Sequence, residues 1–227
     1  MSGIVEGPKI AALSCGKPAF LVVLLHGEGS EGAAIIQQAL NWAPTMPKAD
    51  FLALEAPLSG PGGVGRSWFE AGDLAQASPE AVSRAAALLN DFLDEALAAR
   101  RLPDSHLALV GFSQGAMVAL CAALQRQKRI AAVVSFAGAL PEGAPTGVRS
   151  APPVLMIHGE DDDQLPFAVM SATKERLKAA GVPVKSMRRR GIGHVMDDEG
   201  VLAAGDFLTV HVAHPPAADA DHHDHAH

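Results

Sequence analysis

The stretch of sequence that decides the fold runs from His106 to Leu120 and reads HLALVGFSQGAMVAL. Residues 107–110 are too few for a helix but suit a buried strand, whereas Gln114–Gln127 is rich in Ala, Leu and Met and has the length of a helix. Ser113 therefore stands at a strand-to-helix corner. Such a corner strains the serine backbone, and the glycines two positions before and after it leave room for the turn and for a packed strand. We expect an exposed serine hydroxyl at the N-terminus of a helix.

The rest of the chain alternates between apolar runs of strand length and amphipathic segments of helix length. A short edge strand is expected at Ile10–Leu13, and buried strands are expected at Phe20–Leu25, Phe51–Leu54, Ile130–Phe136, Val154–Ile157 and Val184–Arg190. Helices are expected from about Ala33 to Pro44, and at Ser78–Arg101, Phe167–Ala180 and Gly200–His211. This order predicts an α/β fold with a mostly parallel central sheet and helices on both faces.

Length and composition favour one folded domain. The chain has 227 residues, of which 48% are hydrophobic, and we assign residues 1–213 to a single domain. Residues 214–227 are rich in Ala, Asp and His and are expected to be a disordered tail, whose histidines bind Zn²⁺ or Ni²⁺ only weakly. No catalytic metal and no cofactor are expected.

Charge and cysteine usage limit the partners and the compartment. The formal charge is −7, and no basic cluster occurs beyond Arg188–Arg190, which argues against nucleic acid. The apolar run Ala19–Leu25 is too short to cross a bilayer, so neither a signal peptide nor stable membrane insertion is expected. Cys15 and Cys121 are too few for a disulfide framework. We expect a cytoplasmic protein, and the sequence leaves a homodimer open.

Four of the predicted strands end in polar turns, which hold His26–Glu28, Ser113, Asp161–Asp163 and His194. The carboxyl ends of parallel strands share one edge of the sheet, where sites form. The order Ser, Asp, His is the one in which α/β-hydrolases carry nucleophile, acid and base. A serine hydroxyl is a poor nucleophile, so His194 would accept its proton and an Asp of the acidic run would orient the imidazole.

A negative oxygen forms on the carbonyl that a serine attacks, and it needs hydrogen-bond donors. The backbone N–H groups of Glu28 and Gln114 are the donors that we expect to form this oxyanion hole. We interpret His26, beside Glu28, as a structural residue that holds the loop.

The segment between Glu55 and Ser78 contains five glycines and two prolines and shows no helical period. A loop of this length in a compact domain is usually functional. Its adjacent aromatic residues Trp68 and Phe69 either cover the core or form a pocket wall, and we favour a wall that binds substrate.

Five ordered motifs resemble those of the phospholipase/carboxylesterase family, which includes acyl-protein thioesterases and small bacterial carboxylesterases. They are Leu25-His26-Gly27-x-Gly29, Ser67-Trp68-Phe69, Gly111-Phe112-Ser113-Gln114-Gly115, His158-Gly159-x-x-Asp162 and Gly191-x-Gly193-His194. The resemblance covers about residues 18–210. It implies the α/β-hydrolase fold, a Ser113–Asp162–His194 triad, an oxyanion hole at Glu28 and Gln114, and Trp68 beside the substrate.

The chain departs from the family pattern at Glu28, Ala116 and Asp163, where the family usually has a hydrophobic residue, a glycine and often a proline. A carboxylate at position 28 would oppose the developing oxyanion, so we expect Glu28 to point outward or to select the substrate.

We therefore predict a serine hydrolase that cleaves small-molecule carboxylic esters or thioesters through an acyl-enzyme. Two alternatives remain. A dienelactone hydrolase shares the fold but uses a cysteine nucleophile, and a non-catalytic binding protein would not need Ser113, Asp162 and His194 intact.

Overall fold

The computed structural model describes residues 3–70, 72–144 and 148–213, and these residues are organised around a seven-stranded sheet. The strands follow the order β1-β3-β2-β6-β7-β8-β9 across the sheet. Their bounds are β1 Val5–Ile10, β2 Phe20–Leu25, β3 Ala49–Glu55, β6 Leu107–Phe112, β7 Ala132–Phe136, β8 Val154–Gly159 and β9 Val184–Arg189. The predicted tail, 214–227, lies outside the described residues, so the division of the chain at residue 213 stays a prediction.

All neighbouring strands pair in parallel except β1, which runs antiparallel to β3. The prediction of an edge strand at Ile10–Leu13 is wrong in position, because β1 ends at Ile10. Pro8 and Gly7 hid this strand from sequence reading, and the pairing is irregular between Glu6 and Lys9. Edge strands tolerate such residues because one side of the strand needs no ladder partner.

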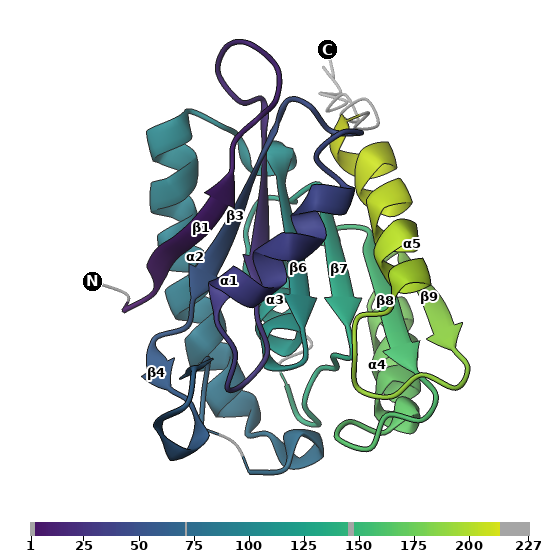
Figure 1. Cartoon of the computed structure of the whole chain (residues 1–227). Helices are drawn as coiled ribbons and strands as arrows, with labels where there is room; N and C mark the ends of the chain where they lie inside the picture. Colours follow the sequence, from purple (N-terminus) through teal and green to yellow (C-terminus); the bar gives the residue numbers. More distant parts are fainter. Residues whose placement is uncertain (1–2, 71, 145–147, 214–227) are drawn as a thin grey trace, which may run out of the picture.

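Helices cover both faces of the sheet, as predicted (Figure 1). One face carries α2 (Pro79–Arg100), α3 (Gln114–Gln125) and α4 (Phe167–Ala179), and the other carries α1 (Gly32–Ile35) and α5 (Asp198–Leu208). Side chains of β2 alternate between the two cores: Leu21 and Val23 pack on the α3 side, while Val22 and Leu24 pack on the α5 side. A strand buried on both faces must be apolar throughout, which explains the unbroken run in β2.

Three regions differ from the expected elements. The segment after Ser30 forms only the single turn of α1 and then a 3-10 helix over Ile36–Asn41. The last helix continues past Leu208 as a π-helical segment, Thr209–Ala213. The segment between Glu55 and Ser78 contains the small hairpin of β4 (Leu58–Ser59) and β5 (Arg66–Ser67) and two 3-10 turns, Pro61–Gly63 and Leu74–Gln76. A further 3-10 turn, Asp104–His106, lies outside this segment and directly before β6. These elements are too short to produce a periodic hydrophobic pattern.

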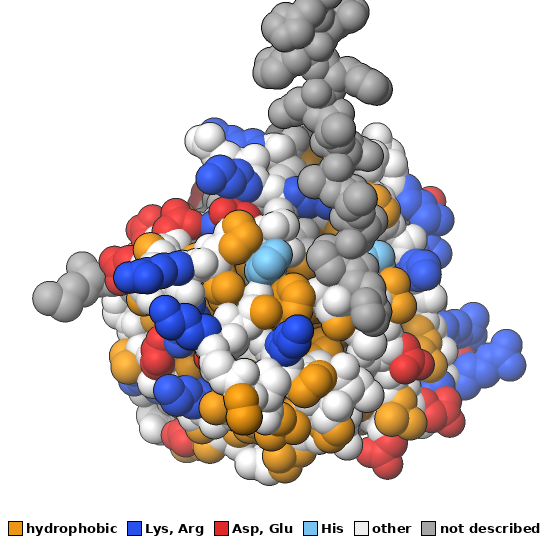
Figure 2. Space-filling view, turned by 90° about the horizontal axis from the view of Figure 1, so that it is seen from above, with side chains coloured by type: hydrophobic (Ala, Val, Ile, Leu, Met, Phe, Trp, Pro, Cys, Tyr) orange, Lys and Arg blue, Asp and Glu red, His pale blue; other side chains and the backbone are white. Residues whose placement is uncertain are grey.

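The parallel strands all point toward the lower edge of the view in Figure 1, where the loops that follow β2, β6 and β8 meet. The opposite edge is seen in Figure 2, where acidic and basic side chains are intermixed around apolar ones. Within the described residues, no helix has both the length and the apolarity needed to cross a membrane.

Candidate active site

Ser113 occupies the corner between β6 and α3 with φ 55° and ψ −121°, a region that non-glycine residues rarely adopt. This confirms the predicted strain. A Cβ at Gly111 would lie 2.4 Å from Cα of Ala116, and a Cβ at Gly115 would lie 2.3 Å from the carbonyl oxygen of Leu25. The two glycines therefore let α3 approach both its own strand and β2. The residue is only 3% exposed, so the expectation of an exposed serine is wrong: the turn is enclosed by its neighbours.

The structure brings Ser113, His194 and Asp162 together in one hydrogen-bonded chain. Oγ of Ser113 lies 2.9 Å from Nε2 of His194, and Nδ1 of the same ring lies 2.8 Å from Oδ2 of Asp162. The His194 side chain is 7% exposed, and the Phe112 ring packs against it with centroids 4.9 Å apart. With Nδ1 donating to the carboxylate, Nε2 of a neutral ring is free to accept the serine proton.

The acidic run resolves in favour of its middle member. Asp162 is buried, whereas Asp161 and Asp163 are exposed. Oδ1 of Asp162 accepts the backbone N–H groups of Gln164 at 3.0 Å and Leu165 at 2.8 Å. Hydrogen bonds of this kind fix the orientation of the carboxylate.

His158 is a site residue whose role sequence reasoning missed. Its Nε2 lies 2.7 Å from the carbonyl oxygen of Leu165 and 3.2 Å from Oδ2 of Asp162. Burial lowers the pKa of this imidazole, which keeps the ring neutral with its proton on Nε2. Nδ1 is buried and has no partner among the described residues. The signal for this role was the fixed spacing of His158 and Asp162 in the β8 motif.

The two expected oxyanion-hole donors lie in the loop after β2 and at the first residue of α3. Neither the N–H of Glu28 nor that of Gln114 has an acceptor among the described residues. The Gln114 side chain is fully buried and connects three segments: its Oε1 accepts Trp68 N–H at 3.0 Å, and its Nε2 donates to the Phe69 carbonyl at 3.1 Å and to Oε1 of Glu28 at 2.9 Å. This network fixes the loop beside the free donors.

Glu28 is half-buried, and its carboxylate turns toward Gln114 instead of pointing outward, which corrects one of the two expectations for this residue. Burial raises the pKa of the carboxyl, and the hydrogen bond from Gln114 partly offsets that rise. Its role in selecting substrates stays a proposal.

Trp68 and Phe69 are 2% and 3% exposed, so most of each side chain covers the core. Both contribute to the wall of a surface cavity of about 490 Å³ that Leu58 and Leu88 also line. The indole Nε1 of Trp68 donates to the carbonyl of His26 at 2.8 Å. Contact of either aromatic residue with substrate stays a prediction.

His26 behaves as a structural residue. It is 1% exposed, its Nδ1 lies 2.7 Å from the Gly27 carbonyl oxygen, and its Nε2 accepts the Ala56 N–H at 3.2 Å. Burial lowers the pKa of this ring. Both ring nitrogens are occupied by backbone groups, which tie the loop after β2 to the end of β3.

Other chemistry is not assembled in the described part of the chain. Cys15 is exposed and Cys121 is buried in α3, and the two cysteines are not joined. Burial raises the pKa of the Cys121 thiol to about 11, so it is not a thiolate at neutral pH. Among residues 3–70, 72–144 and 148–213, no three His, Cys, Asp or Glu side chains group as metal ligands.

Comparison with known proteins gives a consistent result. The sequence model of the phospholipase/carboxylesterase family matches residues 10–212. Esterase YpfH of Escherichia coli is 28% identical over 83% of this chain and 81% of its own length, and acyl-protein thioesterase 1 of Schizosaccharomyces pombe is 25% identical over 86% and 92%.

Solved structures agree with this match. The crystal structure of esterase PE8 superposes with a TM-score of 0.84 at 34% identity, covering 91% of this chain and 98% of that one. Arabidopsis thaliana SOBER1, at 22% identity and a TM-score of 0.76, shares the fold. The chain thus belongs to the phospholipase/carboxylesterase family of α/β-hydrolases.

Proposed function

We propose that this protein hydrolyses carboxylic esters or thioesters of small molecules through an acyl-enzyme formed on Ser113. The observation that carries the proposal is the continuous chain of hydrogen bonds from Ser113 Oγ through His194 to Asp162. Its geometry gives each of the three groups the neighbour that it needs for nucleophilic catalysis. The esterase and thioesterase names of the relatives favour the same reaction class.

In the first half of the reaction, Ser113 Oγ bonds to the substrate carbonyl carbon while His194 Nε2 accepts the hydroxyl proton. The carbonyl oxygen becomes negative and receives hydrogen bonds from the N–H groups of Glu28 and Gln114. Each such donor stabilises the transition state by about 2.7–4 kcal/mol in comparable sites. The bond to the leaving alcohol or thiol then breaks, and His194 returns the proton to the leaving group.

In the second half, a water molecule attacks the acyl carbon of the ester on Ser113 and gives a proton to His194. Collapse of the tetrahedral intermediate releases the carboxylic acid, and the same proton passes back to the serine oxygen. Asp162 stays ionised throughout and stabilises the imidazolium that forms in both halves.

The two alternatives are weaker. A dienelactone hydrolase needs a reactive cysteine at the corner, whereas the nucleophile position holds Ser113 and Cys121 is a buried, protonated thiol. A purely binding role does not account for a strained serine whose hydroxyl meets an oriented histidine, because such strain is retained where the reaction needs it.

Replacement of the nucleophile tests the proposal. Ser113→Ala should lower kcat for p-nitrophenyl butyrate by at least about 10⁴-fold, because attack is lost and only binding and the oxyanion hole remain. Ser105→Ala changes an exposed serine in the 3-10 turn before β6; it is the matched control and should keep wild-type kcat. A Ser113→Ala rate within ten-fold of wild type would reject the assignment.

A further inference from the structure

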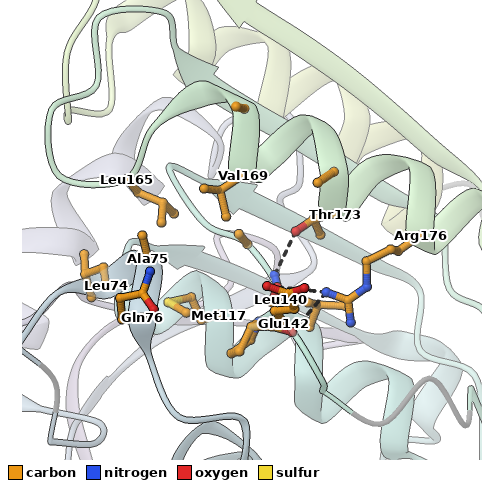
Figure 3. A pocket seen from close by; sticks show the side chains of 14 residues that line it. Leu74, Ala75, Gln76, Met117, Leu140, Glu142, Leu165, Val169, Thr173 and Arg176 are labelled. Carbon is orange, nitrogen blue, oxygen red and sulfur yellow. Dashed lines mark hydrogen bonds between the residues drawn. The ribbon is translucent and has the colours of Figure 1, made fainter.

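A cavity of about 420 Å³ lies between α4, the connection after β7 and the 3-10 turn Leu74–Gln76 (Figure 3). At one end its wall is apolar and is formed by Leu74, Met117, Ala139 and Leu165. At the other end Arg176 reaches from α4 toward Leu140, as Figure 3 shows. The cavity therefore has an apolar end and a cationic end.

The apolar end is built from residues that adjoin the candidate triad. Met117 lies one helical turn after Ser113, and its N–H donates to the Ser113 carbonyl at 3.1 Å. The N–H of Leu165 donates to Oδ1 of Asp162 at 2.8 Å. Four residues of α-helix rise about 6 Å. The apolar end of the cavity is thus about one helical turn from the candidate triad, although Ser113, Asp162 and His194 do not themselves line it.

The guanidinium of Arg176 is held in place by backbone carbonyls. Nη1 donates to Leu140 at 3.2 Å and to Pro141 at 3.0 Å, and Nη2 lies 3.5 Å from the Ala144 oxygen. These contacts leave the Nε–H and one Nη2–H of the five guanidinium donors without a described partner. The side chain is half-buried.

Arg176 differs from the enclosed residues Arg126 and Arg189, because no described carboxylate pairs with its guanidinium. The Arg126 guanidinium pairs with Asp94 at 2.7 Å and Asp104 at 2.5 Å, and the Arg189 guanidinium pairs with Asp197 at 2.6 Å. Among the residues that the structure describes, no carboxylate oxygen lies within 4.0 Å of the Arg176 guanidinium. A positioned cation with free donors beside an apolar cavity suits an anion on the end of an apolar ligand.

We propose that this cavity binds the far end of a substrate whose aliphatic chain terminates in a carboxylate, with the carboxylate on Arg176. The inference rests on the proposed function and names its substrate class. The methylene groups lie against Met117 and Leu165, and the carboxylate accepts the free Nε–H and Nη2–H of Arg176. Glu142, which is exposed and lines the same cavity, acts in the opposite direction by repelling a carboxylate.

The test compares pairs of esters that differ only in the terminal group. For an acyl-side carboxylate the pair is p-nitrophenyl hydrogen suberate and p-nitrophenyl octanoate; for an alcohol-side carboxylate it is the acetate ester of 6-hydroxyhexanoic acid and hexyl acetate. Each pair gives one ratio, the kcat/KM for the charged ester divided by the kcat/KM for the neutral ester. For at least one of the two pairs, Arg176→Gln should lower this ratio at least ten-fold. Glutamine retains an N–H donor for the carbonyls, and the ratio cancels any general loss of rate.

Three variants serve as controls on this ratio. Lys178→Gln removes the same charge from an exposed position of α4 that does not line the cavity, so it should leave the ratio at the wild-type value. Arg176→Lys keeps the charge but not the planar donors and should restore part of the ratio. Glu142→Gln removes the opposing anion and should raise the ratio.

Calorimetry with suberate alone makes the test independent of catalysis. Suberate should bind wild-type protein and Ser113→Ala, and should bind Arg176→Gln at least ten-fold more weakly. The inference would be overturned if Arg176→Gln left the ratio unchanged in both pairs and suberate did not bind. Hydrolysis of the neutral esters in that case would leave the esterase proposal standing. Failure to hydrolyse any ester would instead reject the proposed function, and the binding result would then decide the inference.

Discussion

Glu28 places a carboxylate next to one of the two backbone groups proposed to stabilise a negative oxygen. It accepts a hydrogen bond from the Gln114 side chain at 2.9 Å, so it cannot swing freely into solvent. Burial raises the pKa of this carboxyl, and the hydrogen bond from Gln114 acts against that rise by favouring the charged form. The residue therefore supports the loop through its hydrogen bond and opposes the oxyanion through its charge.

Glu28→Gln separates these two effects because glutamine keeps an acceptor for Gln114 and carries no charge. We expect kcat for p-nitrophenyl butyrate to rise about 3- to 10-fold, since each 1.4 kcal/mol of relieved repulsion is worth ten-fold. Glu31→Gln, an exposed carboxylate in the same loop, is the matched control and should not change kcat. An unchanged or lower kcat for Glu28→Gln would show that the charge does not oppose the reaction.

The segment from the end of β8 to the start of α4 holds the acid of the candidate triad in place. Backbone N–H groups of Gln164 and Leu165 bind one oxygen of Asp162, and His158 and His194 share the other. The Nε2–H of His158 donates its hydrogen bond to the Leu165 carbonyl at 2.7 Å, and the same nitrogen lies 3.2 Å from Oδ2 of Asp162. His158 is thus a positioning residue, which acts on the reaction only through Asp162.

Removal of this support should reduce kcat without weakening substrate binding. We expect His158→Ala to lower kcat about ten-fold with KM unchanged and to cost about 1–3 kcal/mol of stability, because buried acceptors lose their donor. His158→Gln retains an N–H near the same place and should recover part of kcat. His106→Ala, which removes a histidine in the 3-10 turn before β6, is the control. A folded His158→Ala protein with wild-type kcat would contradict the positioning role.

The local sequence was sufficient to predict the main elements of the sheet and the corner at Ser113, because buried parallel strands are unbroken apolar runs and the corner requires its glycines. It did not predict β1, whose Gly7 and Pro8 break the strand pattern. The contacts of His158 with Leu165 and Asp162 and the network of Gln114 were also missed. They depend on contacts such as that between Gln114 and Phe69, 45 positions apart, which only the assembled fold brings together.

Two buried histidines and one half-buried histidine connect the stability of the whole molecule to pH. Burial lowers the pKa of His26, His158 and His211 below the ordinary value of 6.5. Below that pH the unfolded chain binds more protons than the folded protein, so the free energy of unfolding should fall as pH decreases from 6.5 toward the lower folded-state values. The raised pKa of Glu28 has the opposite effect: above pH 4.5 it makes the free energy of unfolding increase as the pH decreases.

Urea denaturation at pH 7.5, 6.5 and 5.5 measures this effect. Each fully buried histidine contributes at most about 1.4 kcal/mol per pH unit, so the decrease between pH 6.5 and 5.5 should be detectable. His158→Gln removes one of these groups and should show a shallower decrease than wild type. Stability that is constant or rises as the pH falls from 6.5 to 5.5 would contradict this coupling.

The central claim is that the Ser113 hydroxyl is the nucleophile, and covalent labelling tests it most directly. A fluorophosphonate probe reacts with a serine that an adjacent histidine activates, so the intact mass of the protein should increase by a single adduct. Peptide mapping should place that adduct on Ser113, and Ser113→Ala should not react. An adduct on another residue, or labelling of Ser113→Ala at the wild-type rate, would contradict the account.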